Sequence, residues 1–228
     1  MAKSKSISAT QALQRLMLGN KRFVKNRSTG LLGVHRDIRK LMIKSRGPFA
    51  IILSCSDSRA PSEILFDQGL GDLFVIRVAG NVVAPSLIGS VEFAAATTQA
   101  RLVVVMGHTQ CGAIQATFDA IEGKKPLISD NISDIVDRIR PHIHMHAPPR
   151  KKGTQKTALK NNLGRTRSRE TILRDAVRAN VLASANQLRH ASRFLEEMVR
   201  HKHLMIVGAE YDIETGEVDF FDMPPIKK

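Results

Sequence analysis

Two short segments of the chain place cysteine, histidine, aspartate and arginine side chains close together in sequence. The first reads CSDSR over residues 55–59, and the second reads GHTQCG over residues 107–112. Thiolate sulfur and imidazole nitrogen are ligands that Zn²⁺ prefers, and three protein ligands leave a fourth position open for water. We therefore expect Cys55, His108 and Cys111 to bind one zinc ion per chain, with His108 and Cys111 on one helix face if their segment begins a helix.

A carboxylate and a guanidinium follow the first cysteine. Asp57 comes shortly after Cys55, so its carboxylate could accept a hydrogen bond from a water on the metal or take the place of that water. Arg59 carries the guanidinium fork that can hold both oxygens of a carboxylate. Because an open zinc site lowers the pKa of its water to about 7, the pattern predicts a metal hydroxide beside an oriented carboxylate.

Each of these residues also has an ordinary structural role open to it. The two cysteines could be inert thiols of the core, Asp57 and Arg59 could form a structural ion pair, and His108 could cap a helix. One such residue alone would favour the structural interpretation, but all five at two strand ends favour the metal site. A redox pair is disfavoured, because the sequence has no Cys-x-x-Cys.

Four apolar runs of strand length must position these residues. Continuous rather than alternating apolarity is typical of strands buried on both faces, as in parallel sheets. The four runs span residues 49–54, 73–78, 101–106 and 203–208, and helical patterns span residues 87–99, 113–121, 132–142 and 171–201. This order predicts a single α/β domain with a mainly parallel central sheet flanked by helices, and a short C-terminal edge strand at 217–221. Both motifs follow strands, at the edge where such sheets bind ligands.

The net charge of +14 is concentrated outside the middle of the chain. We expect a basic N-terminal helical arm over residues 1–46, with a helix at 8–26 capped by Ser8 or Thr10, and a core over 47–228 with a basic variable loop at 147–169. Such basic segments could bind nucleic acid or an anionic membrane surface. Aromatic residues make up only 4% of the chain, too few for a base-stacking surface, so solvated segments are favoured.

Other function classes are excluded by length and composition. The longest apolar runs are too short to span a bilayer, and the basic N-terminus has no apolar stretch behind it. Two cysteines in 228 residues do not make a disulfide framework. We therefore expect a cytoplasmic protein with no membrane insertion and no specific nucleic-acid partner.

The CSDSR and GHxxCGA motifs resemble those of the β-class carbonic anhydrases. The segments APSEILFDQGLGDLFVIRVAGNVV and VGAEYDIETGEVDFF also resemble that family, and the similarity runs over residues 7–221 apart from 147–169. The resemblance implies the zinc ligands Cys55, His108 and Cys111 and a catalytic pair of Asp57 with Arg59. It also implies an apolar CO₂ pocket at a dimer interface, whose residues would be Phe74, Ala79, Gly112 and, from the neighbouring subunit, Phe93.

The activity implied by the resemblance is the zinc-dependent, reversible hydration of CO₂ to bicarbonate and a proton. Zinc-bound hydroxide would attack CO₂ while the Asp57–Arg59 pair orients it, in a homodimer or homotetramer. One alternative is hydrolysis of CS₂ or COS at the same site. Another is a basic protein that binds nucleic acid or a membrane surface and carries a purely structural zinc ion.

Overall fold

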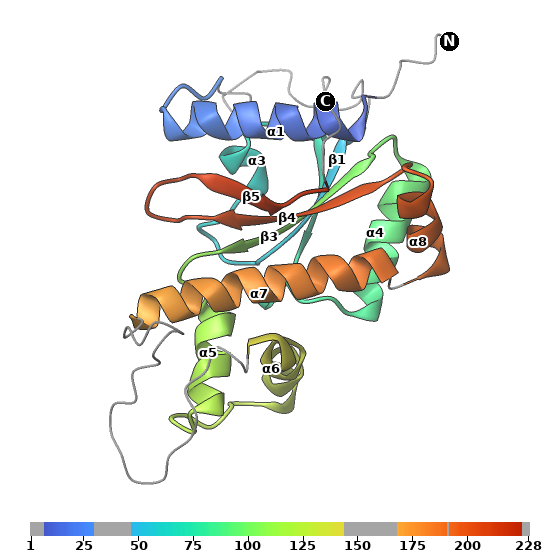
Figure 1. The fold of residues 1–228 in the computed structure, drawn as a ribbon. Coiled ribbons are helices and arrows are strands. Elements are labelled where there is room, and N and C mark those ends of the chain that lie inside the picture. Colours follow the sequence, from blue (N-terminus) through green and yellow to red (C-terminus); the bar gives the residue numbers. More distant parts are fainter. Residues whose placement is uncertain (1–6, 30–46, 144–167, 191, 225–228) are drawn as a thin grey trace.

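The computed structural model describes residues 7–29, 47–143, 168–190 and 192–224, and a five-stranded sheet forms its centre (Figure 1). The strands are β1 (Ala50–Ser54), β2 (Leu73–Arg77), β3 (Leu102–His108), β4 (Met205–Tyr211) and β5 (Val218–Asp222). They lie in the order β2-β1-β3-β4-β5, with the first four parallel and β5 antiparallel to β4. The predicted α/β fold, with a mainly parallel sheet and a short C-terminal edge strand, is confirmed.

The two central strands, β1 and β3, are buried along their whole length, as their continuous apolar sequences predict. Successive side chains point to opposite faces of the sheet. Ile52 and Val104 therefore join the apolar core on one face, while Ile51 and Val103 join the core on the other.

β3 continues beyond the apolar run predicted at residues 101–106. Gly107 and His108 extend it because they pair with Glu210 and Tyr211 of the parallel strand β4. The backbone pairing of a neighbouring strand leaves no mark in the apolar pattern of β3 itself. As a result, the histidine of the second motif stands at the last position of a strand.

Helices cover both faces of the sheet (Figure 1). One face carries α1 (Ala9–Val24) and the short α3 (Ser62–Leu65), and the other carries α4 (Pro85–Thr97), α7 (Arg169–His190) and α8 (Arg193–Arg200). Beyond α7, away from the sheet, α5 (Gly112–Ile121) and α6 (Asp130–Ile143) enclose a third apolar core. The sheet is thus flanked by helices as expected.

The N-terminal helix begins where its sequence predicts. Ser8 is the N-cap of α1: its hydroxyl oxygen accepts from the Gln11 N–H at 3.2 Å, and the Gln11 side chain accepts from the Ser8 N–H at 2.8 Å. This reciprocal pairing is a capping box. Of the two caps considered, Ser8 is therefore the one used.

Asn20 fastens α1 to two other parts of the molecule. Its buried side-chain amide donates to the carbonyl oxygens of Leu65 at 3.2 Å and Gly216 at 2.9 Å. Its side-chain oxygen accepts from the Val218 N–H at 2.9 Å. Because every polar atom of this buried side chain is hydrogen-bonded, α1 is held to both α3 and the turn between β4 and β5.

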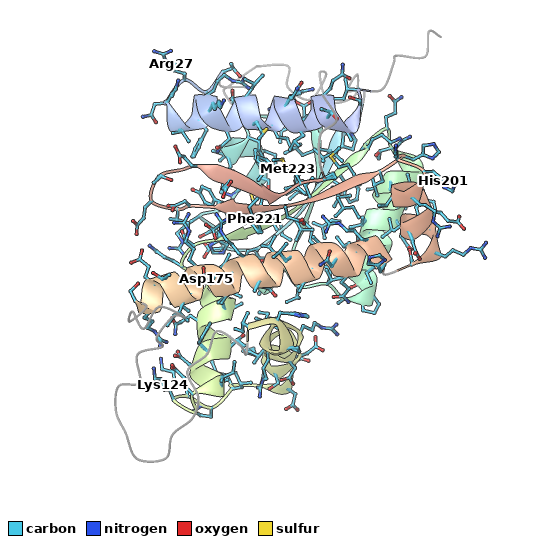
Figure 2. All side chains as sticks on the ribbon, in the orientation of Figure 1. Arg27, Lys124, Asp175, His201, Phe221 and Met223 are labelled. Carbon is cyan, nitrogen blue, oxygen red and sulfur yellow. The ribbon has the colours of Figure 1, made fainter. Side chains whose placement is uncertain are left out.

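Charged side chains fix α7 against the sheet. The buried carboxylate of Glu210 in β4 accepts from Arg174 Nε at 2.7 Å and from Arg178 Nε at 3.2 Å. The Arg178 guanidinium carbon also lies 4.6 Å from the centre of the Phe221 ring, and Figure 2 shows that Phe221 lies between β5 and α7. These contacts set the position of α7 along β4.

The single helix predicted over residues 171–201 is wrong. The structure has α7 up to His190 and a separate helix, α8, from Arg193. Ser192 has extended backbone angles, and its hydroxyl oxygen accepts from the Leu195 N–H at 3.2 Å, so it acts as an N-cap and starts a new helix. The two helices bury Leu188 and Leu195 in the same apolar core.

Several predictions concern residues that the structure does not describe. The predicted boundary at residue 46 between the arm and the core lies outside the described residues, as does the predicted basic loop except for its last two residues, Ser168 and Arg169. Within the described ranges, no helix combines the length and the apolar character needed to cross a membrane.

Candidate metal centre

The two cysteines and the histidine predicted as ligands meet at the carboxyl edge of the sheet. Cys55 follows directly after β1, His108 ends β3, and Cys111 comes before α5. All three are buried, and their ligand atoms lie within 4.8 Å of one another. Among the described residues they form the cluster of histidine, cysteine and carboxylate groups that is able to hold a metal ion. The structure therefore brings the three predicted ligands together in one cluster.

The His108 ring is oriented with one nitrogen free to bind a metal. Its Nδ1 lies 2.8 Å from the Thr109 carbonyl oxygen, so Nδ1 carries the proton and donates it. Its Nε2 is buried and has no hydrogen-bond partner within the described part of the chain. A buried nitrogen lone pair without a partner is costly, and a metal ion at the cluster would satisfy it.

The condition under which His108 and Cys111 would share one helix face is not met, because their segment does not begin a helix. His108 belongs to β3, and Cys111 is the N-cap residue of α5, so the turn between them separates the two elements. Gln110 makes this turn with a φ of 58°, in the left-handed region that few side chains adopt. The strand pairing of His108 with Tyr211 is the reason that the helix cannot begin earlier.

The two thiols differ in their hydrogen bonding. Cys55 Sγ accepts a hydrogen bond from the Cys111 thiol, which lowers the pKa of Cys55, and the hydrogen bond from the Gly80 N–H at 3.3 Å lowers it further. The pairing with Cys55, together with burial, raises the pKa of Cys111. The lowered pKa favours the thiolate form of Cys55, which is the form in which a cysteine binds a metal.

Gly80 contributes to this site although the sequence reasoning did not single it out. It has a φ of 70°, and an added Cβ atom would lie 2.8 Å from Ile139 Cδ1, so the position requires glycine. Its place in η1 (Ala79–Asn81), shortly after the end of β2, is the signal that could have identified it. Glycine here lets the backbone N–H approach the sulfur of Cys55.

Asp57 and Arg59 form a two-point ion pair beside the metal cluster. Arg59 Nε and Nη2 donate to Asp57 Oδ1 and Oδ2 at 2.9 and 2.8 Å, and the Arg59 N–H donates to Oδ1 at 2.9 Å. The guanidinium holds the pKa of the Asp57 carboxyl well below its usual range. Asp57 Oδ2 lies 3.9 Å from His108 Nε2, so an ionised carboxylate stands next to the ligand cluster.

Arg77 supports the loop that carries Cys55 and Asp57. From the end of β2, its Nε donates to the Cys55 carbonyl oxygen at 3.1 Å, and its Nη2 donates to the Asp57 carbonyl oxygen. The sequence reasoning missed this residue as well. Its position, level with Ser54 at the end of the adjacent parallel strand, is the only signal for it.

The residues expected to form an apolar substrate pocket lie on four different elements. Phe74 lies in β2 and Ala79 opens η1, both half-buried, and Gly112 is the exposed first residue of α5. Phe93 lies on α4, where 60% of its surface is exposed. Ala79 and Gly112 are each next in sequence to a residue of the metal centre, Gly80 and Cys111.

Comparison with known proteins gives a consistent result. The family model described as "Carbonic anhydrase" matches residues 50–218. A carbonic anhydrase of Mycolicibacterium smegmatis is 41% identical over 145 residues, which cover 63% of this chain and 67% of that protein. A carbonic anhydrase of Pseudomonas aeruginosa is 32% identical over 210 residues and 85% of each chain.

Solved structures share the fold. A β-carbonic anhydrase of Sordaria macrospora, described as tetrameric, aligns with a TM-score of 0.66 at 17% identity over 92% of this chain and 97% of that one. The β-carbonic anhydrase CafA of Aspergillus fumigatus aligns with a TM-score of 0.67 at 22% identity, over 95% and 92% of the two chains. At such identities the likeness concerns the fold alone.

Proposed function

This chain belongs to the β-class carbonic anhydrase family and is a carbonic anhydrase, and from that premise we propose that it interconverts CO₂ and bicarbonate with one zinc ion held by Cys55, His108 and Cys111. The observation that carries the proposal is the buried His108 Nε2, which has no partner among the described residues and lies with two thiols in one cluster. Two sulfurs and one imidazole nitrogen suit zinc.

The number of ligands favours a catalytic rather than a purely structural ion. Within the described residues the cluster contains three such side chains, whereas structural zinc sites are closed by four. When bound at an open site, zinc supplies the Lewis acidity that lowers the pKa of a coordinated water to about 7. The residues around the ion would orient the attacking water and bind CO₂.

Asp57 is proposed to orient the attacking oxygen. Ionised and held at both oxygens by Arg59, its carboxylate can only accept hydrogen bonds. It would accept from the O–H of the attacking water and so direct a lone pair at the carbon of CO₂. A new C–O bond then gives bicarbonate, and the proton released passes to solvent. Arg59 acts through Asp57, as a positioning residue.

CO₂ is proposed to lie against Phe74 and Ala79, with the Gly112 N–H near its oxygen and Phe93 of a second subunit closing the pocket. An uncharged molecule with no net dipole is suited to a small apolar pocket of this kind. The exposure of Phe93 on α4 supports a homodimer or homotetramer, because a large exposed aromatic side chain is typical of an interface. Two free cysteines also support the cytoplasm as the location.

A proton-release assay tests the proposal. Zinc-loaded protein, mixed rapidly with dissolved CO₂ in a pH-indicator buffer, should acidify the solution far faster than buffer alone. The same protein with its zinc removed by a chelator should lose this activity and regain it on addition of zinc. Release of H₂S from CS₂ or COS, without CO₂ hydration, would favour the alternative hydrolase.

A further inference from the structure

A chain of contacts connects Arg59 to the turn between β4 and β5 through Gln110. Arg59 Nη1 lies 3.4 Å from Gln110 Oε1, and Arg59 Nη2 lies 3.4 Å from the Gln110 carbonyl oxygen. On its other side, Gln110 Nε2 donates to Glu214 Oε1 at 2.9 Å. The three residues come from the loops after β1, β3 and β4, so the contacts connect the carboxyl ends of three adjacent strands.

From this geometry we propose that Gln110 and Glu214 are positioning residues for the Asp57–Arg59 pair. The inference rests on the orienting role proposed above for Asp57. The backbone N–H and two guanidinium nitrogens of Arg59 donate to Asp57, but 47% of the arginine side chain is exposed. Without an attachment to another loop, the ion pair and its loop could shift relative to His108 and Cys111. Gln110 supplies that attachment. Because Gln110 directly precedes the ligand Cys111, its contacts with Arg59 fix the Asp57 carboxylate relative to the metal ligands.

Glu214 determines which end of the Gln110 amide faces Arg59. A carboxylate accepts hydrogen bonds and cannot donate them, so it attracts the amide NH₂. The amide oxygen must then face the guanidinium, as it does here. If the amide were reversed, its NH₂ would oppose the N–H groups of Arg59. The charge at position 214 therefore reaches the ion pair through the orientation of one amide.

Two further hydrogen bonds hold the same turn and the end of β4 to the metal-binding loop. The Ile213 N–H donates to the Thr109 hydroxyl oxygen at 3.0 Å, and the Thr109 N–H donates to the Tyr211 carbonyl oxygen at 2.9 Å. These bonds keep Glu214 within reach of Gln110 without depending on either side chain. Substituting Glu214 should therefore change the amide contact while the turn stays in place.

Charge reversal at Glu214 gives the sharpest test. Glu214→Lys places a donor beside Gln110, which would draw the amide oxygen away from Arg59, whereas Glu214→Ala only removes the acceptor. We expect turnover to fall about 5- to 10-fold in Glu214→Lys and less in Glu214→Ala, at or just below the lower end of the roughly 10- to 100-fold that loss of such supporting contacts costs. KM, zinc content and melting temperature should stay close to those of the unmodified protein.

Glu217→Lys is the matched control. Glu217 is an exposed glutamate of the same turn, and its side chain makes no hydrogen bond or ion pair within the described ranges. The substitution makes the same change of charge at the same edge of the sheet. Because the Glu217 side chain has no contact to lose, this variant should keep full turnover. Gln110→Asn adds a second test: asparagine tolerates the positive φ, but its side chain is too short to join Arg59 to Glu214.

A measurement on the metal-free protein tests whether Gln110 and Glu214 hold Arg59 in place, independently of the reaction. The Nε–H signal of Arg59 in nitrogen-15 NMR, identified by its loss in Arg59→Lys, should exchange with solvent faster in Glu214→Lys and Gln110→Asn than in Glu217→Lys. Equal exchange and equal turnover in all three would overturn the positioning role.

The variant Asp57→Asn distinguishes failure of this inference from failure of the proposed function. If Asp57→Asn also kept full turnover, the orienting role of Asp57 would fall with it. If Asp57→Asn alone lost turnover, only the role of Gln110 and Glu214 would fall.

Discussion

Asp57 Oδ2 lies 3.9 Å from His108 Nε2, so an ionised carboxylate stands beside the nitrogen that is proposed to bind the metal. At this separation a metal ion bound by the histidine would be within reach of the carboxylate. Asp57 could therefore accept a hydrogen bond from a water on that ion, or replace the water. The balance between these two states should depend on pH.

Activity should rise as the pH increases from about 7 to above 8, following the pKa of a zinc-coordinated water. Asp57 does not set this dependence, because Arg59 keeps its pKa low and the carboxylate is ionised throughout that range. Acid protonates the attacking oxygen and leaves the carboxylate free to take its place. Initial rates of CO₂ hydration across this range, in buffers of constant ionic strength, measure the effect. A flat profile from pH 6 to 9 would contradict the mechanism.

Cys55→Ser or Cys111→Ser should abolish stable zinc binding. Each change replaces a soft thiolate with a hydroxyl and leaves a polar gap between two strand ends. Zinc per chain, measured by elemental analysis after dialysis, should fall from about one to near zero, together with activity. Ser56→Ala, at the exposed neighbour of Cys55, is the control and should keep its zinc. Full zinc in either cysteine variant would refute the ligand assignment.

Arg59→Lys should keep zinc but lose at least about tenfold in turnover, the usual cost of removing such a support. Lysine keeps the charge but cannot hold both oxygens of Asp57. Asp57→Asn should also lose turnover, because its amide NH₂ can donate toward the attacking oxygen instead of accepting from it.

Arg138→Lys is the matched control for that loss. Arg138 holds Asp134 in a similar two-point ion pair on α6, with Nε–Oδ2 and Nη2–Oδ1 distances of 2.9 and 3.0 Å. If Arg59→Lys kept wild-type turnover, as this control should, the Asp57–Arg59 pair would be a structural salt bridge with no orienting role.

Gly107→Ala should destabilise the protein by about 1–3 kcal/mol. An added Cβ would lie 2.7 Å from Val181 Cγ2 and 2.9 Å from Val177 Cγ1, so α7 would have to move away from β3. Urea unfolding curves measure the loss. The double substitution Gly107→Ala with Val181→Ala should be less destabilised than the sum of the two single changes, because the smaller residue makes room. Simple additivity would show that the contact with Val181 is not the cause.

Much of the fold could be predicted because its signals are local. The apolar runs of β1 and β3 reflect burial on both faces of the sheet, and Ser8 reveals the start of α1 by its spacing from Gln11. The ligand cluster could be predicted for a related reason: its members lie at or shortly after the ends of two strands that are neighbours in the sheet.

What the sequence did not reveal depends on partners that are distant along the chain. His108 lies in a strand because of Tyr211, and Gln110 is oriented by Glu214, in each case a residue more than a hundred positions away. The break at Ser192 was missed for a different reason, since a serine inside a long helical pattern is also compatible with a continuous helix. Hydrophobic periodicity reveals neither contacts between residues distant along the chain nor whether a serine acts as an N-cap.

The hydrogen bonds of Asn20 limit how the chain can be shortened. A protein beginning at residue 47 would lose α1 and leave the carbonyl oxygens of Leu65 and Gly216 and the N–H of Val218 without partners. It would also expose the apolar face of the sheet that α1 covers, which favours aggregation during expression. Anyone designing a smaller version of this enzyme should therefore retain the N-terminal helix, however dispensable its basic sequence looks.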